Sequence, residues 1–142
     1  MEGRVFNWSD IHTLIFDFDG IFTDNRVIVD QNGLEAVICN RADSLGINYL
    51  LRFKELNKWN LDLFILSTEK NTVVQERAKK LEINCYSGIS DKRKFIEERV
   101  FRRFPADDSV TSGIVFLGND LNDLPGIDFA KWSFAPSDSH PL

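Results

Sequence analysis

The chain has 142 residues, and 43% of them are hydrophobic, which is enough to bury the core of a single domain over residues 1–142. Its formal net charge of −5 argues against a nucleic-acid partner, because phosphate backbones bind basic surfaces. No apolar run approaches the roughly 18 residues of a membrane span, and residues 1–10 do not resemble a secretory signal, so we expect no membrane partner and a cytoplasmic protein.

Short apolar runs that alternate with helical patterns predict the fold. The runs that read as buried strands are Thr13–Phe18, Leu61–Leu66, Ile83–Tyr86, Gly113–Gly118 and Lys131–Pro136. Helical spacing of apolar residues appears at Leu45, Tyr49, Phe53 and Leu56, at Val74, Ala78 and Leu81, and at Ile96, Val100 and Phe104. This alternation predicts an α/β fold of three layers, a Rossmann-like parallel sheet between helices, with a ligand crevice at the carboxyl ends of the strands.

One segment departs from the alternation directly after the first predicted strand. Arg26–Asp30 and Glu35–Cys39 have the residue types of strands, and they flank Gln31, Asn32 and Gly33, which are typical of a turn. The segment therefore predicts a β-hairpin that projects from the sheet.

The first predicted strand ends in two aspartates. Asp17 and Asp19 flank Phe18 in the string DFDGIFTD, so the alternation of a strand sends both carboxylates to the same side. Two carboxylates this close repel each other unless a cation lies between them, and Mg²⁺ prefers such hard oxygen ligands. Gly20 permits a tight turn after the pair. The string predicts a Mg²⁺ site, and the alternative is a pair of acidic residues that cap a strand end.

Polar groups follow two further predicted strands. Ser67 and Thr68 come after Leu61–Leu66 and before a helix, where hydroxyl and free backbone N–H groups form either a phosphate seat or an ordinary helix cap. Lys92 begins the third predicted helix, where a cation is unfavourable for the helix dipole. It is either a solvated surface lysine or a cation directed at phosphate.

The string GNDLND follows the fourth predicted strand. It brings Asn119, Asp120 and Asp123 to the edge of the sheet that holds Asp17. Asn119 and Asp120 are both candidates for a further metal ligand beside Asp17 and Asp19, and the spacing does not choose between them.

Because these elements occur in order at one edge of the sheet, we interpret them together as a catalytic site. Asp17 would attack a phosphoryl group and form an aspartyl-phosphate that water hydrolyses, and Asp19 would transfer the protons. Ser67, Lys92 and Mg²⁺ would hold the phosphoryl oxygens.

The four elements in this order resemble the motifs of the haloacid dehalogenase superfamily over nearly the whole chain. The strings DFDGIFTDN, NRADSLGI, SGISDK and GNDLNDLP, with the hairpin, resemble a narrower branch. That branch contains 3-deoxy-D-manno-octulosonate 8-phosphate phosphatase, nonulosonate (sialic acid type) 9-phosphate phosphatases, and the phosphatase-like domain of acylneuraminate cytidylyltransferases. The resemblance implies that there is no cap domain and that a homotetramer closes the site. It also implies that Asn40, Arg41 and Asp43 lie near the substrate, although Asp43 equally suits a helix cap.

Three positions depart from that branch. Thr68 and Glu69 stand where the branch commonly has Gly-Arg, so a positive substrate contact is in doubt. Asn119 stands in place of a metal-ligating aspartate, so one negative charge is missing, although an amide oxygen still binds Mg²⁺. The sequence ends at residues 140–142, where the branch continues into a glycine-rich tail with a basic residue.

We therefore expect a Mg²⁺-dependent phosphatase that acts on the terminal phosphate of a 2-keto-3-deoxy sugar acid, either an octulosonate 8-phosphate or a nonulosonate 9-phosphate. The alternative is a catalytically weak oligomerisation or regulatory module associated with acylneuraminate cytidylyltransferase. The presence of Asp17 and Asp19 favours the enzyme, whereas Asn119 favours the module.

Overall fold

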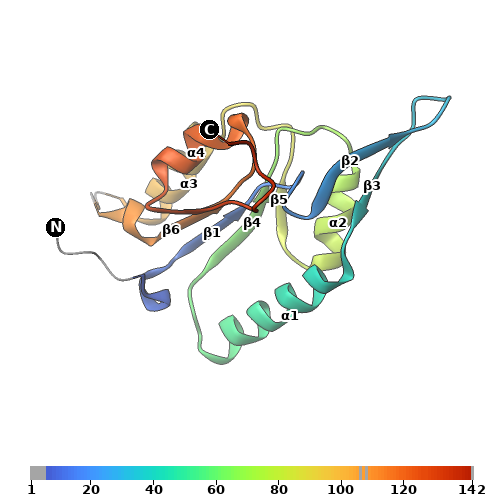
Figure 1. Cartoon of the computed structure of the whole chain (residues 1–142). Coiled ribbons are helices and arrows are strands. Elements are labelled where there is room, and N and C mark those ends of the chain that lie inside the picture. Colours follow the sequence, from blue (N-terminus) through green and yellow to red (C-terminus); the bar gives the residue numbers. More distant parts are fainter. Residues whose placement is uncertain (1–5, 106, 108, 142) are drawn as a thin grey trace.

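The computed structural model describes residues 6–105, 107 and 109–141, and a parallel sheet organises them (Figure 1). Within these residues five strands pair in the order β5-β4-β1-β6-β7. Their bounds are β1 Thr13–Phe16, β4 Asp62–Leu66, β5 Asn84–Tyr86, β6 Ile114–Leu117 and β7 Trp132–Phe134. Each lies inside an apolar run that predicted it. Because β1 pairs with both β4 and β6, the three strands that precede polar motifs are neighbours.

Helices cover both faces of the sheet, as the alternation predicted. The α-helices are α1 Arg41–Leu56, α2 Val73–Leu81, α3 Lys92–Arg103 and α4 Leu124–Phe129, and short 3₁₀ turns lie at Trp8–Asp10, Val110–Gly113 and Leu121–Asp123. In Figure 1, α1 and α2 lie on one side of the sheet and α3 and α4 on the other. None of the described helices has both the length and the apolar content to cross a membrane.

The strand side chains alternate between two buried clusters. Leu63 and Ile65 of β4 pack with Val74 and Ala78 of α2 on one face. On the other face, strand residues of β4 and β6 pack with Ile96 and Val100 of α3. Because the strands are buried on both faces, their sequences are continuously apolar.

The predicted hairpin is present. Strand β2 spans Thr23–Val29, strand β3 spans Glu35–Cys39, and the two are antiparallel. Asp30 stabilises the turn because its Oδ1 accepts the backbone N–H groups of Asn32 at 2.8 Å and Leu34 at 2.9 Å. The hairpin projects from the body of the molecule (Figure 1). The described residues contain no cap domain beyond this hairpin.

The outer face of α1 differs from what its sequence pattern suggests. The helix forms, and Asn40 caps it by accepting the N–H of Ala42 at 2.9 Å. Its apolar stripe nevertheless does not cover the sheet, because the side chains of Leu45, Tyr49, Phe53 and Leu56 are 56 to 73% exposed. Apolar residues of the hairpin are exposed in the same way. The periodicity predicted the helix correctly, but not the surface that its apolar stripe contacts.

Candidate active site

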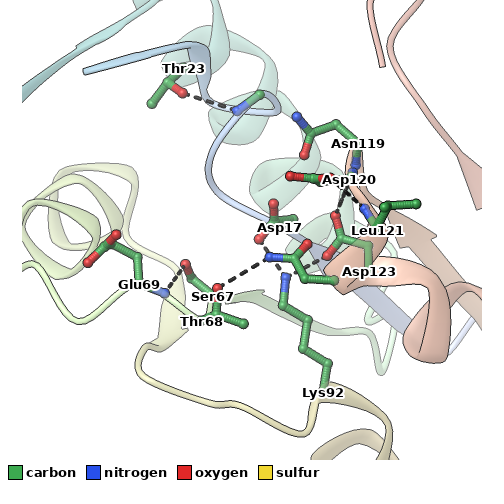
Figure 2. Close-up of polar contacts among 12 residues, drawn as sticks. Asp17, Thr23, Ser67, Thr68, Glu69, Lys92, Asn119, Asp120, Leu121 and Asp123 are labelled. Atoms are coloured by element: carbon green, nitrogen blue, oxygen red, sulfur yellow. Dashed lines mark hydrogen bonds and ion pairs between the residues drawn. The ribbon is translucent and has the colours of Figure 1, made fainter. Parts of the chain in front are cut away.

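The predicted motif residues meet at the carboxyl edge of the sheet (Figure 2). Phe16 of β1 is in register with Ile65 of β4 and Leu117 of β6, so Asp17 emerges between the ends of two neighbouring strands. Its backbone N–H donates to the carbonyl of Leu117 at 2.8 Å. The convergence follows from the strand order, because parallel neighbours end at the same edge.

Lys92 is buried at the first turn of α3 and is not a solvated surface lysine. The residue is 1% exposed, and its ammonium group donates to Asp17 Oδ1 at 2.7 Å and to Asp123 Oδ1 at 2.5 Å (Figure 2). Asp91 caps the helix instead, since its carboxylate accepts the N–H of Lys94 at 2.9 Å. The cation is therefore directed at the end of β1.

Asp123 is a site residue that the sequence reasoning placed at this edge without assigning it a role. It is fully buried, and its Oδ2 accepts the backbone N–H groups of Asn119 at 3.0 Å and Asp120 at 3.3 Å. A Cβ atom on Gly118 would lie 2.7 Å from its carboxyl group, so the loop needs glycine there. Asp123 thus fixes both Lys92 and the loop after β6. The last aspartate of the string GNDLND indicated an acidic residue at this edge. The sequence pattern does not show how the loop folds, so it did not indicate that this side chain contacts Lys92.

The two aspartates after β1 have unusual proton affinities. Burial raises the pKa of Asp17 to about 6, Lys92 opposes the shift, and Asp123 adds to it. The pKa of Asp19 is also raised, first by partial burial and then by the charge of Glu69. Such paired, perturbed carboxylates in a crevice are typical of functional sites.

The turn after Asp19 holds the side chain of Asn119. Gly20 has a φ of +79°, and a Cβ atom on it would lie 1.8 Å from the amide nitrogen of Asn119, so both the backbone and the close contact require glycine. The hydroxyl of Thr23 accepts the N–H of Gly20 at 3.1 Å and so closes the turn. The amide of Asn119 therefore lies against the loop that carries the two aspartates.

These contacts define which residues could hold a metal ion. Among the described residues, no three His, Cys, Asp or Glu side chains form a metal-binding group by themselves. A mixed set fits better, because Mg²⁺ commonly uses one or two carboxylates and takes its other oxygens from an amide, water or phosphate. Asp17, Asp19 and Asn119 are the candidates for such a set, because Asn119 lies against the turn that follows the two aspartates. Asp120 is exposed, and its Oδ1 accepts the N–H of Leu121 at 2.6 Å, so it caps a 3₁₀ turn.

Ser67 and Thr68 lie at the same edge. Ser67 is 2% exposed, and its hydroxyl accepts the backbone N–H of Glu69 at 3.1 Å. The hydroxyl of Thr68 accepts the side-chain amide of Asn122 at 3.3 Å, which connects the loop after β4 to the loop after β6. Figure 2 shows Ser67 and Thr68 across from Asp17, with Lys92 nearby.

A pocket of about 240 Å³ opens beside Asp19, between the hairpin and the start of α2. Its lining residues are Asp19, Asn25, Arg26, Val27, Glu35, Val37, Glu69, Asn71 and Val73. We call it the Asp19 pocket. It is the space next to Asp19, the candidate proton donor, in which the rest of a phosphate ester could lie.

The structure does not bring Asn40, Arg41 and Asp43 to the Asp19 pocket. They line a second pocket of about 610 Å³ with Ile21–Asp24, and the two pockets share no lining residue. The carbonyl of Asn40 accepts the guanidinium of Arg77 at 2.8 Å. A substrate role for these three residues stays a prediction.

Comparison with known proteins identifies relatives of the whole described fold. No family model matches the chain. A structure from Streptomyces avermitilis, described as a HAD family hydrolase, is 36% identical, has a TM-score of 0.80, and covers 99% of this chain and 80% of its own. The KdsC 3-deoxy-D-manno-octulosonate 8-phosphate phosphatase of Salmonella typhi is 29% identical over 135 residues, which are 94% of this chain and 66% of the relative. The chain thus spans slightly less than two thirds of that curated relative.

A third similarity concerns the fold. The 3-deoxy-D-manno-octulosonate 8-phosphate phosphatase of Moraxella catarrhalis, in complex with a magnesium ion, a phosphate ion and a KDO molecule, has a TM-score of 0.78 at 23% identity over 94% of this chain and 72% of its own. The ordered motifs, the sheet without a cap domain among the described residues, and the similarity to the Streptomyces protein lead to one conclusion: the chain belongs to the haloacid dehalogenase (HAD) superfamily.

Proposed function

We propose that this protein is a phosphoric monoester hydrolase in which Asp17 is the nucleophile. One observation carries the proposal: a buried ammonium group, Lys92 Nζ, lies 2.7 Å from Asp17 Oδ1 at the crevice of the sheet. A fixed cation beside a carboxylate attracts the oxygens of a phosphoryl group to the atom that attacks it. The KdsC relatives are named as phosphatases, which supports the same reaction.

The reaction proceeds in two balanced steps. An Asp17 carboxylate oxygen forms a bond to phosphorus while the bond from phosphorus to the leaving oxygen breaks, and Asp19 protonates that oxygen. Asp19 then takes a proton from water, the water oxygen attacks phosphorus, and phosphate leaves with Asp17 restored. Partial burial raises the pKa of Asp19, which favours the protonated form that the first step needs.

The remaining groups bind the phosphoryl oxygens. Lys92 provides positive charge, and Ser67 with Thr68 provides hydroxyl and backbone donors at the end of β4. Asp123 has a supporting role, since it holds Lys92 at 2.5 Å and thereby positions the ammonium group.

We propose that Asp17 and Asn119 hold Mg²⁺ through their side chains and Asp19 through its backbone carbonyl, so that the carboxyl group of Asp19 stays free for proton transfer. The ion would neutralise the negative charge that the aspartates and the phosphate bring together. The donor chemistry supports a divalent metal, and the Moraxella protein of the same fold binds magnesium.

The substrate that we propose is the terminal phosphate of a 2-keto-3-deoxy sugar acid. The KdsC relatives are named for an octulosonate 8-phosphate, and a nonulosonate 9-phosphate is the longer candidate. We also propose a homotetramer, in which neighbouring subunits cover the exposed apolar residues of the hairpin and α1 and close the cap-less site.

Phosphate release from purified protein tests the proposal. The substrates are p-nitrophenyl phosphate and the two sugar acid phosphates, each with Mg²⁺ and with a chelator. We expect release only with the metal and faster turnover of a sugar acid phosphate than of the aryl ester. If no ester releases phosphate, the enzyme proposal fails, and the alternative of a regulatory module takes its place.

A further inference from the structure

The Asp19 pocket carries acidic groups that the phosphoryl-transfer steps do not use. Glu35 of β3 and Glu69 of the loop after β4 both line it. We propose that this pocket binds the part of the leaving alcohol next to the phosphate ester, accepts hydroxyl or ammonium groups there, and rejects a carboxylate. Glu69 is the main residue that sets this preference. The inference rests on the proposed function, because the pocket receives the leaving group only if Asp17 attacks and Asp19 protonates.

The described residues that line the pocket offer no unpaired cation to bind an anionic group. Among the described residues that line the pocket, Arg26 is the one cation, against the carboxylates of Asp19, Glu35 and Glu69. Arg26 is already engaged, since its Nη2 and Nε donate to Asp24 Oδ2 at 2.5 and 2.9 Å. In the first step Asp19 carries the proton for the leaving oxygen, so a substrate carboxylate in the pocket would face the like charges of Glu35 and Glu69.

Lys92 does not change this balance. It is 1% exposed, it is held between Asp17 and Asp123, and it does not line the pocket. Its charge acts on the phosphoryl position. Figure 2 shows the carboxylate of Glu69 directed away from Lys92, so the two ends of the site present opposite charges to a ligand.

The local backbone fixes the acceptor position of Glu69. Its Oε1 accepts the N–H groups of Lys70 at 2.7 Å and Asn71 at 2.9 Å, and the residue is half-buried. The side-chain amide of Asn71 donates to Glu35 Oε2 at 3.3 Å, which links the loop to the hairpin. Carboxylates held by such contacts are strong acceptors for hydroxyl and ammonium donors.

The preference depends on how far the carboxylate of the leaving alcohol lies from the phosphate ester. In the terminal phosphate ester of a 2-keto-3-deoxy sugar acid, the carboxylate is at the opposite end of the carbon chain from the phosphate, and the carbons next to the ester carry hydroxyl groups. Such a substrate satisfies the preference, whereas a short phosphorylated acid, with its carboxylate two or three carbons from the ester, does not.

A matched pair of three-carbon esters tests the inference. Glycerol 3-phosphate and 3-phosphoglycerate differ only in a hydroxymethyl group in place of a carboxylate. With Mg²⁺ constant, kcat/KM is measured for each ester, and each is also titrated as an inhibitor of p-nitrophenyl phosphate hydrolysis. We expect the wild-type protein to favour glycerol 3-phosphate by on the order of tenfold, because one like charge is repelled at short range.

Two variants assign the preference to a residue. In Glu69→Gln the amide oxygen still accepts the backbone donors of Lys70 and Asn71, so the loop is kept while the charge is lost, and the ratio between the two esters should fall several-fold. Glu98→Gln removes the same charge from an exposed position on α3 and should leave the ratio unchanged.

The outcomes separate this inference from the phosphatase proposal. If the aryl ester is hydrolysed but 3-phosphoglycerate is used or bound as well as glycerol 3-phosphate, the pocket proposal is wrong and the phosphatase stands. An equal ratio in wild type and Glu69→Gln removes Glu69 from the role. If no ester is hydrolysed, the phosphatase proposal fails, and calorimetric titration of the two esters still decides whether the pocket discriminates between them.

Discussion

Charge and hydrophobicity are distributed in opposite ways at two regions of this molecule. At the carboxyl edge of the sheet, Asp17, Lys92 and Asp123 are at most 4% exposed. On the hairpin and α1, large apolar side chains face outward, among them Ile28 at 55% and Leu56 at 73%. Burying an ion costs several kcal/mol unless it is paired, and exposing apolar surface forfeits about 25 cal/mol per Å².

The two regions differ in how that cost is offset. At the sheet edge the buried charges compensate one another through ion pairs of 2.5 and 2.7 Å. On the hairpin and α1, nothing among the described residues covers the outward-facing apolar side chains, such as Ile28 and Leu56. The ion pairs of the first region therefore form within one chain and suit that region to chemistry, whereas the second region is suited to contact with another chain.

The largest effect should come from the nucleophile. Asp17→Asn replaces a carboxylate with an amide of nearly the same shape, which is a poor nucleophile, so we expect phosphate release to fall by at least about a thousandfold. Lys92 keeps its ion pair with Asp123, so the fold should persist. Phosphate release with Mg²⁺ measures the effect.

The melting temperature of the same variant is the control. Burial raises the pKa of Asp17 to about 6 from 3.8, so the ionised carboxylate destabilises the metal-free fold as pH rises through that interval and above it. At pH 7.5 without metal, Asp17→Asn should therefore melt at the same or a higher temperature than wild type. Full activity in a variant with that melting curve would remove Asp17 from the nucleophile role.

Stability should respond most strongly to Asp123. In Asp123→Asn the amide NH₂ must face either Lys92 or the backbone N–H groups of Asn119 and Asp120, so donors meet donors inside the protein. We expect the free energy of unfolding to fall by about 3 kcal/mol, as for other broken buried ion pairs. Urea denaturation followed by circular dichroism measures the change.

Asp120→Asn is the matched control for that substitution. It makes the same chemical change three residues earlier at an exposed position, where asparagine also serves as a helix cap. The expected change is below about 0.5 kcal/mol. Equal losses in the two variants would show that the burial of Asp123 does not decide the stability of this loop.

The exposed region should control assembly rather than folding. Ile28→Asp places a charge on a hairpin residue that does not line the Asp19 pocket, and we expect the proposed tetramer to dissociate in sedimentation velocity while the circular dichroism spectrum stays unchanged. Arg102→Gln changes the net charge by the same amount on α3 and should leave assembly intact. Wild-type protein that sediments as a monomer would contradict the tetramer proposal.

The fold was predictable because its signals are local. Continuous apolar runs predicted the parallel strands, and the turn at Gln31, Asn32 and Gly33 predicted the hairpin. The direction of the α1 stripe was not predictable, because periodicity identifies an apolar face without identifying its partner. The exposed residues Tyr49 and Phe53 follow the pattern of core residues.

The site was predictable as far as strand order determines it. Asp17, Ser67 and Asn119 follow three strands, and their convergence needs only a parallel sheet. The ion pair of Asp123 with Lys92 and the acidic lining of the Asp19 pocket were not predictable. Both depend on how loops fold onto side chains distant in sequence, and no repeating pattern records that.

The smallest effect is expected from Asn119, because the substitution there tests only whether this residue is the third Mg²⁺ ligand. Asn119→Asp adds a carboxylate of the same size next to Gly20, so the turn should accommodate it. If Asn119 is the third ligand, Mg²⁺ should bind more tightly by on the order of 1 kcal/mol, about tenfold at most, because a carboxylate attracts the dication more strongly than an amide, less its greater desolvation. A magnesium titration of activity, repeated by calorimetry without substrate, measures the change. Unchanged or weaker affinity would assign the position to Asp120, because a second carboxylate beside an existing ligand adds repulsion instead of binding.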